Sequence, residues 1–192
     1  MKGKLRIFIS SVQKEFAGER AALRDYLRGY PLFRRFCDVF LFEDVPAQDR
    51  RPDELYLDEV ERCDIYLGLF GNEYGNDDAE GVSPTWREFE LAGKLSKPRF
   101  IFVRKSSTAG HPKMAALIAR AGNELIRRRF GSMPELIVAV YACLVNYLEE
   151  MGLLRTAPFE TAAARNATLA DISREKVVWF LRRARLERDY AL

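Results

Sequence analysis

The sequence predicts an α/β protein with a flavodoxin-like, doubly wound parallel sheet and a C-terminal helical extension. Short apolar segments alternate with amphipathic helical segments, and no internal repeat is present. Of the 192 residues, 48% are apolar, which is enough for a full core. Because crossovers between parallel strands are right-handed, this alternation places helices on both faces of one sheet.

Four short apolar segments are predicted to be the main strands. They span residues 5–9, 36–42, 64–70 and 99–103. Leu125-Ile126 is predicted to form a short edge strand. The strand order is expected to be of the flavodoxin type.

Helices are predicted after each strand from the spacing of apolar residues and from capping signals. They cover residues 13–28, 52–62, 112–123 and 134–151, and a further helix carries Glu88 and leads into the strand at residues 99–103. We expect Ser10-Ser11 to end the first strand and cap the first helix. Ser83 with Pro84 predicts another helix start, with Thr85-x-x-Glu88 as a capping box in an alternative register. Gly152 is predicted to be the C-cap of the helix that ends near residue 151.

The composition changes after residue 152, which predicts three parts. Residues 1–152 form the α/β domain, residues 153–172 form a linker rich in Ala, Thr, Pro and Arg, and residues 173–192 form a connector helix. We expect the connector helix to bury an apolar face in cis or across a homodimer. That face consists of Val177, Phe180, Leu181 and Ala184.

Charge and cysteine content narrow the function classes. The net charge of +3 comes from 31 basic and 28 acidic residues, so direct nucleic-acid binding is not expected from this chain. Cys37, Cys63 and Cys143 lie in apolar surroundings and are predicted to be reduced core thiols. No apolar segment reaches membrane-spanning length, so a cytoplasmic location without membrane association is expected.

The single histidine limits the chemistry further. His111 stands before Pro112 and is predicted to be a surface residue at a helix start. A histidine-dependent triad and most transition-metal sites are therefore not expected, and no metal site is predicted. Arg127-Arg128-Arg129 is the densest basic run, and either a solvated surface or a site for a phosphate or an acidic partner would explain it.

We expect four segments to converge at the carboxyl edge of the sheet, where ligands bind in open α/β folds. They are Ser10-Ser11, Glu43-Asp44, residues 71–75, and Thr85 with Glu88. They contribute hydroxyl groups, glycines, an aromatic ring and carboxylates, but no glycine-rich phosphate motif. Glu88 is the candidate catalytic residue, because it lies in the first turns of a helix that begins at this edge. The predicted ligand-binding residues are Ser10, Ser11, Asp44, Gly71, Tyr74, Gly75 and Thr85.

A carboxylate at this edge is suited to chemistry at the anomeric carbon of a sugar. The transition state there resembles an oxocarbenium ion, which a nearby negative charge stabilises. A single glutamate is enough when the leaving group is already cationic, as nicotinamide is in NAD. Glu43 or Asp44 would then orient the ribose hydroxyl groups. The alternative is that Glu88 only stabilises the helix N-terminus and that Glu43 and Asp44 only cap the next loop.

Three motifs in the first half of the chain resemble one family. They lie within residues 6–20, 64–75 and 83–98. They resemble the bacterial domain-of-unknown-function family related to TIR domains and nucleoside deoxyribosyltransferases, over about residues 4–105. The resemblance implies a TIR-like flavodoxin fold, and it likens Thr85-x-x-Glu88 to the element that places the catalytic glutamate of deoxyribosyltransferases and NAD-cleaving TIR domains.

Motifs in the second half resemble a narrower group. They lie within residues 111–114, 124–130, 141–149 and 158–160. They are similar to bacterial proteins that carry this domain ahead of a Schlafen AlbA-type ATP-binding module and that are described as transcriptional regulators or RecG-like ATP-dependent DNA helicases. The resemblance implies a downstream ATP-binding module as a partner, which this chain lacks.

The sequence therefore predicts an N-terminal sensor and interaction module of a bacterial regulatory or defence protein, with a nucleotide-like ligand in the crevice. The alternative is an enzyme that cleaves the N-glycosidic bond of NAD or a nucleoside with Glu88. No cofactor is predicted with certainty, and NAD or a related nucleotide is the candidate ligand or substrate.

Overall fold

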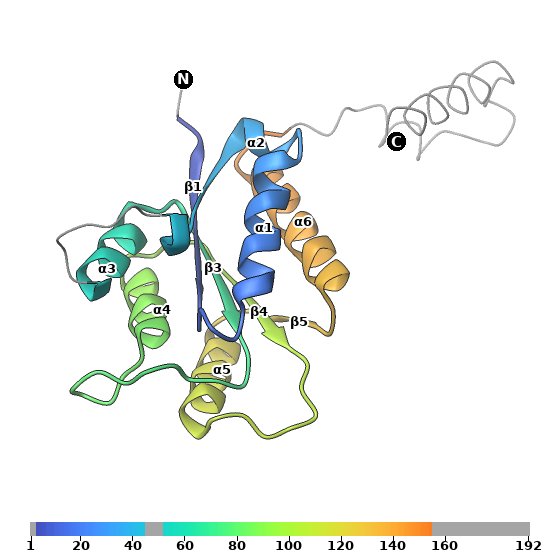
Figure 1. The fold of residues 1–192 in the computed structure, drawn as a ribbon. Helices are drawn as coiled ribbons and strands as arrows, with labels where there is room; N and C mark the ends of the chain where they lie inside the picture. Colours follow the sequence, from blue (N-terminus) through green and yellow to red (C-terminus); the bar gives the residue numbers. More distant parts are fainter. Residues whose placement is uncertain (1–2, 45–51, 155–192) are drawn as a thin grey trace, which may run out of the picture. The chain divides into compact units, whose positions relative to one another are not determined.

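The computed structural model describes residues 3–44 and 52–154, which form a five-stranded parallel sheet flanked by helices (Figure 1). The strand order is β2-β1-β3-β4-β5, as in flavodoxin-like folds, so the predicted fold class is confirmed. The strands are β1 (Leu5–Ser11), β2 (Cys37–Phe40), β3 (Ile65–Phe70), β4 (Arg99–Arg104) and β5 (Arg128–Phe130).

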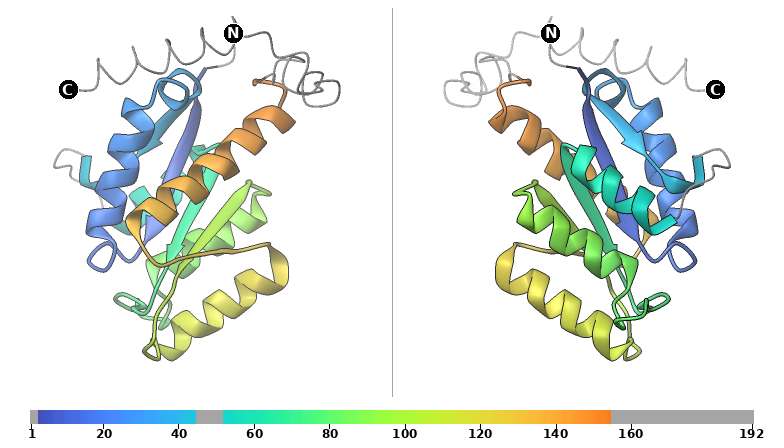
Figure 2. Two further views of the ribbon diagram at one scale, coloured as in Figure 1. Left: turned by 90° about the vertical axis from the view of Figure 1, so that its right-hand side faces the viewer. Right: turned by 90° about the vertical axis from the view of Figure 1, so that its left-hand side faces the viewer.

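Helices cover both faces of this sheet (Figure 2). The helical elements are α1 (Ala17–Gly29), α2 (Phe33–Phe36), the 3-10 helix η1 (Phe42–Asp44), α3 (Pro52–Arg62), α4 (Pro84–Lys94), α5 (Pro112–Glu124) and α6 (Met133–Glu150). Helices α3, α4 and α5 share one face, and α1 lies on the other with residues 133–143 of α6.

A hydrophobic core fills the space between the sheet and the α3–α4–α5 face. Tyr66 and Phe70 of β3 pack there with Phe89 of α4 and Leu117 of α5, and all four side chains are fully buried. Burying large aromatic and aliphatic side chains is the main favourable term in folding. This core fixes β3 against α4, the two elements that meet beside Glu88.

The start of α1 differs from the prediction. Ser10 and Ser11 belong to β1, because they continue its parallel pairing with β3 opposite Gly68 and Leu69. The first strand therefore ends at Ser11, two residues later than predicted, and the prediction that Ser10-Ser11 caps the first helix is wrong. The residue before α1 is Phe16, which makes no side-chain capping bond but is fully buried. Burial of the Phe16 ring anchors this end of the helix instead.

Two edge strands also differ from the prediction. β2 covers only Cys37–Phe40, because its four residues pair with the first half of β1 and the chain is helical on either side. The last edge strand forms at Arg128–Phe130 and pairs with β4, whereas Ile126 in the predicted strand is fully exposed. The side chains of Arg128 and Arg129 are exposed along this edge.

The chain divides into two compact units, residues 1–143 and 144–192. In the second unit, residues 144–150 complete α6, and Gly152 follows with a φ of 66° that suits the predicted helix end. The predicted boundaries at residues 152 and 172 stay predictions. Residues 155–172 of the predicted linker and the whole connector helix lie outside the described residues.

Two of the three cysteines lie in the core, as predicted. Cys37 and Cys63 are buried, and burial raises the pKa of each thiol to about 11, so both are protonated at neutral pH. Cys143 is half-buried. Among the described helices, none combines the length and the apolar character needed to cross a membrane.

We expect Phe16→Ala to lower the free energy of unfolding by about 3–5 kcal/mol, because it leaves a cavity where a fully buried ring contacts the core. The Phe16 ring lies 6.5 Å from the ring of Phe130 and 4.3 Å from the guanidinium carbon of Arg104. Urea unfolding of the two proteins measures the difference. Phe16→Leu, which keeps most of the volume, should lose clearly less, and equal losses would contradict a cavity effect.

Candidate functional site

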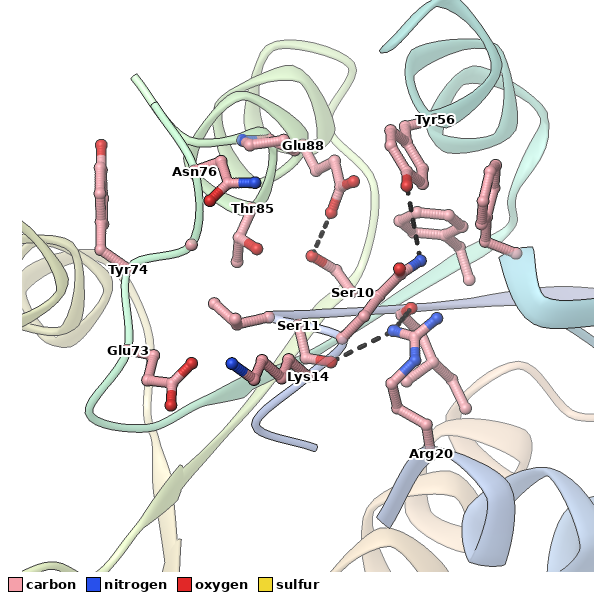
Figure 3. Close-up of a pocket in the computed structure, with 17 residues that line it drawn as sticks. Ser10, Ser11, Lys14, Arg20, Tyr56, Glu73, Tyr74, Asn76, Thr85 and Glu88 are labelled. Carbon is pink, nitrogen blue, oxygen red and sulfur yellow. Dashed lines mark hydrogen bonds between the residues drawn. The ribbon is translucent and has the colours of Figure 1, made fainter. Parts of the chain in front are cut away.

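A pocket of about 310 Å³ opens at the carboxyl ends of β1 and β3, where the sequence predicts a crevice (Figure 3). Ser10 and Ser11 at the end of β1 form its floor, and Thr85 and Glu88 of α4 form one wall. The loop that follows β3 supplies a further wall through residues 73–76. Segments that are far apart in the sequence therefore meet at one sheet edge.

The start of α4 places Glu88 in this pocket. Ser83 is the N-cap, its hydroxyl oxygen accepts a hydrogen bond from Trp86 N at 3.4 Å, and Pro84 occupies the first helical position. The predicted Ser83-Pro84 start is confirmed, and the Thr85 register is not used. Because Thr85 and Glu88 are three residues apart, they lie on the same face of the helix, where both are buried.

A chain of hydrogen bonds orients the Glu88 carboxylate. The Ser10 hydroxyl donates to Glu88 Oε2, and the Tyr66 hydroxyl donates to Ser10 Oγ at 2.8 Å. Burial raises the pKa of Tyr66 well above its ordinary value, so its phenol keeps the proton and acts as a donor. Ser10 therefore accepts from Tyr66 and uses its own proton for Glu88.

Gly68 makes this chain possible. Ser10 pairs with Gly68 in the sheet, and the Tyr66 side chain must pass over Gly68 to reach the serine. A Cβ at position 68 would lie 3.1 Å from Tyr66 Cε1 and 2.9 Å from Ile101 Cδ1. Glycine is thus the residue that lets the tyrosine ring extend along β3 to Ser10.

The environment of Glu88 brings its protonation close to neutral pH. Burial raises the pKa of Glu88 to about 7, against the opposing effects of the Ser10 hydrogen bond and the Arg20 charge. Glu88 is 5% exposed, so little solvent remains to stabilise the charged form. A carboxyl group with a shifted pKa in a pocket at the ligand-binding edge of a sheet is a candidate for chemistry.

Arg20 holds the end of β1 from the opposite face of the sheet. Its Nη1 donates to Ile9 O at 2.9 Å and to Ser11 Oγ at 3.1 Å, the two residues that flank Ser10. Its Nε and Nη2 donate to both carboxylate oxygens of Glu43 at 2.6 and 2.7 Å. Arg20 is 3% exposed, so its charge depends on this two-bond ion pair.

The pocket brings together most, but not all, of the predicted site residues. Those that line it are Ser10, Ser11, Tyr74, Gly75, Thr85 and Glu88. Asp44 is not among the lining residues, and its carboxylate binds Arg24 at 2.9 Å and Arg28 at 2.8 Å. Gly71 does not line the pocket either. Ligand contacts by any of these residues stay a prediction.

Gly71 has a clear structural reason. The Glu15 carboxylate accepts hydrogen bonds from Asn72 N at 2.8 Å and Glu73 N at 3.0 Å, which holds the loop after β3. A Cβ at Gly71 would lie 2.2 Å from Glu15 Oε1. Glycine therefore allows the carboxylate to approach the backbone that leads to Tyr74 and Gly75.

Tyr74 braces the same loop. Its ring stacks on His111 with centroids 5.2 Å apart, and its hydroxyl accepts a hydrogen bond from Ser83 N at 3.2 Å. His111 is the N-cap of α5, as the sequence predicts for a helix-start histidine. Lys113 also contacts the Tyr74 ring, with Nζ 5.4 Å from its centroid. The ring is almost fully buried, so most of its surface serves packing.

Sequence reasoning missed several residues that line the pocket. They are Gln13, Lys14, Arg20, Phe42, Tyr56, Glu73 and Asn76. Arg20 carried a usable signal, because it lies on the same helical stripe as Phe16, Leu23 and Leu27. A charged residue on an apolar stripe requires a buried partner. Phe42 and Tyr56 resembled ordinary core aromatic residues and carried none.

A second pocket of about 430 Å³ adjoins Glu88 from the side of α3 and α4. Tyr56, Pro84 and Glu88 line both pockets. Arg87 also lines the second pocket and forms ion pairs with Asp78 and Glu80. In residues 3–44 and 52–154 we find no group of three or more His, Cys, Asp or Glu side chains that could hold a metal ion.

Comparison with known proteins identifies the family. The family described as domain of unknown function DUF4062 matches residues 6–142. The chain belongs to the DUF4062 family. Among solved structures, this DUF4062 domain is similar to the Clostridium botulinum CMP N-glycosidase BcmB, with a TM-score of 0.44 and 12% identity over 77% of this chain and 98% of that chain. A search of curated proteins finds no significant match.

We expect Glu88 to make the stability of the domain depend on pH. Its pKa in the folded state, about 7, lies above the ordinary value of 4.5, so the folded state binds the proton more tightly. The resulting stabilisation is full below pH 4.5 and is lost as the pH rises through about 7. Relative to Glu88→Gln, the wild type should therefore lose up to about 3 kcal/mol across this range.

Urea unfolding of wild type and Glu88→Gln at half-unit pH steps measures this difference. Glu90→Gln is the matched control, because Glu90 lies on the same helix but pairs with Arg120 at the surface. Partial burial raises the pKa of Glu90, but hydrogen bonds with Arg120 and Trp86 and the charge of Arg120 outweigh it. The net shift of its pKa is downward, so no loss is expected between pH 4.5 and 7. A pH-independent difference for Glu88→Gln would show that Glu88 titrates normally.

The Arg20–Glu43 pair is expected to be strongly coupled. Arg20 is buried, so Glu43→Gln leaves its charge without a full partner, whereas Glu43 has a side chain 39% exposed and is easily hydrated after Arg20→Met. A double-mutant cycle on unfolding free energy should give a coupling of about 1–3 kcal/mol. The exposed pair Lys105–Glu135 is the control and should show no measurable coupling. Equal coupling energies for the two pairs would contradict the claim that buried Arg20 depends on Glu43.

Proposed function

We propose that this DUF4062 domain binds a nucleoside or nucleotide in the pocket and cleaves its N-glycosidic bond with Glu88. The observation that carries the proposal is the buried Glu88 carboxyl group, which Ser10 orients at the ligand-binding edge of the sheet. Its pKa of about 7 means that the charged form is abundant at neutral pH and is poorly solvated. A poorly solvated carboxylate interacts strongly with a developing positive charge.

The chemistry needs one carboxylate and water. As the bond between the anomeric carbon and the base nitrogen breaks, its electron pair leaves with the base and positive charge develops on the sugar. The ionised Glu88 either bonds to the anomeric carbon or stabilises this charge. Water then adds its hydroxyl to the anomeric carbon, and its proton ends on the base or on the buffer. Ser10 holds Oε2 throughout, which fixes the direction of the carboxylate.

The choice of N-glycosides follows from the placement of the other carboxylates near the pocket. Most O-glycosidases use a pair of carboxyl groups, one of which protonates the leaving oxygen. Here Glu43 is bound through both oxygens to Arg20. Glu73 lines the pocket but is exposed and lies at the end away from Glu88, so neither carboxylate forms a pair with Glu88 (Figure 3). A base that leaves without prior protonation, such as the nicotinamide of NAD, does not require the second group.

The sensor role stays a prediction and uses the same pocket. A sensor binds the ligand and does not consume it, so the two functions differ in a measurable way. Binding of a nucleoside or NAD without release of the base would favour the sensor. The predicted Schlafen AlbA-type partner, the homodimer and the cytoplasmic location also stay predictions.

We expect the wild-type protein to release the free base from NAD or from at least one common nucleoside or its 5′-monophosphate. Glu88→Gln should reduce the rate by at least about 100-fold, because the amide cannot carry the negative charge that the transition state requires. Chromatography of the reaction mixture measures the released base. Glu90→Gln serves as the control and should retain full activity, since its side chain pairs with Arg120 away from the pocket.

The pH dependence of the reaction rate tests which protonation state of Glu88 acts. If ionised Glu88 acts, kcat/KM rises as the pH passes through about 7 and then becomes constant. Equal base release by wild type and Glu88→Gln would remove Glu88 from the mechanism. A rate that falls as the pH rises through 7 would instead require the protonated form.

A further inference from the structure

The pocket beside Glu88 has two chemically different ends. At one end, the rings of Phe42 in η1 and Tyr56 in α3 pack together with centroids 4.7 Å apart and an interplanar angle of 44°. At the other end lie the polar side chains of Lys14, Glu73 and Asn76. Figure 3 shows Tyr56 on one side of the Ser10–Glu88 pair and these three residues on the other.

We infer that the Phe42–Tyr56 pair is the nucleobase subsite of this pocket and that the sugar lies at the polar end. This inference takes the class of ligand, a nucleoside or nucleotide, from the proposed function. It adds the orientation of that ligand in the pocket. In this orientation the bond between base and sugar falls between the two ends, which is where Glu88 lies. The reverse orientation would place the base among the charged groups of Lys14 and Glu73.

The aromatic end suits a base for two reasons. Both rings are half-buried and line the pocket, so a flat base can stack there and remove apolar surface from water. Stacking accepts any base, because each base has a π face. The Tyr56 hydroxyl, which accepts a hydrogen bond from Gln13 Nε2 at 3.4 Å, adds a polar group at the edge of this end.

The polar end suits a sugar because hydroxyl groups must keep hydrogen-bond partners when they leave water. Glu73 offers acceptors, Lys14 offers donors, and the Asn76 amide offers both. The loop that carries Glu73 and Asn76 is held by Glu15 through Asn72 N and Glu73 N. The backbone at the start of this loop is therefore held before a ligand binds, which limits the backbone entropy lost on binding.

Binding to variants in the Glu88→Gln background tests the orientation, since this background does not consume the ligand. Adenosine, guanosine, cytidine and uridine are titrated by calorimetry, and the tightest binder is compared with its free base and with D-ribose, by NMR shift titration where binding is weak. Tyr56→Leu should weaken binding of the nucleoside and of the base about 10-fold and leave ribose unchanged. Asn76→Ala should weaken the nucleoside and ribose and leave the base unchanged.

Two further variants keep the result interpretable. Tyr56→Phe keeps the ring and should bind the nucleoside within about 3-fold of the background, because stacking is retained. Phe42→Leu should weaken binding in the same way as Tyr56→Leu. It takes the place of Tyr56→Leu if circular dichroism shows that the Tyr56→Leu protein is not folded. The reverse pattern, equal effects on base and ribose, or no nucleoside binding would overturn the orientation. If the variants show the expected binding pattern but the wild type releases no base, only the proposed cleavage is contradicted.

Discussion

The hydrogen-bond chain from Tyr66 through Ser10 to Glu88 is the constraint on which the rest of the site depends. It joins β3, β1 and α4, three elements whose residues are far apart in the sequence. It also determines which oxygen of Glu88 is held. Without it, a carboxyl group as buried as Glu88 would lack a polar partner for Oε2, and burial alone would favour the protonated form. The chain therefore keeps the charged form within reach of neutral pH.

The supports of this chain come from both faces of the sheet. On one face Gly68 leaves the space that the Tyr66 ring occupies. On the other, Arg20 binds the residues on either side of Ser10 and is itself held by Glu43. Gly68, Arg20 and Glu43 thus support the direction of the Ser10 hydroxyl from outside the hydrogen-bond chain itself. A change in Arg20 or Glu43 acts on Glu88 through β1, and a change at Gly68 acts through the Tyr66 ring.

Local signals predicted much of the fold. Apolar periodicity gave the order of the elements, and the Ser83-Pro84 cap placed Glu88 on the correct face of α4, because both signals depend on neighbours within one or two turns. Features that depend on distant partners were not predicted. Ser10 extends β1 because β3 pairs with it, and Arg20 finds Glu43 only once α1 and η1 are folded.

The candidate site shows the same limit. Asp44 was expected in the crevice because it follows a strand, yet the arginines of α1 draw its carboxylate away from the pocket. Phe42 lies in η1 and Tyr56 in α3, and only tertiary structure brings their rings together. Composition alone could not separate these two rings from the many aromatic residues of the core.

The intermediate pKa of Glu88 has a consequence for selectivity among ligands of different charge. With a pKa of about 7, the neutral and ionised forms are nearly equally populated at pH 7. Changing the protonation state of Glu88 near pH 7 therefore costs little free energy. A bound cation would favour the ionised form, and an uncharged ligand would leave both forms populated, so the charge of Glu88 can adapt to the ligand that the pocket holds.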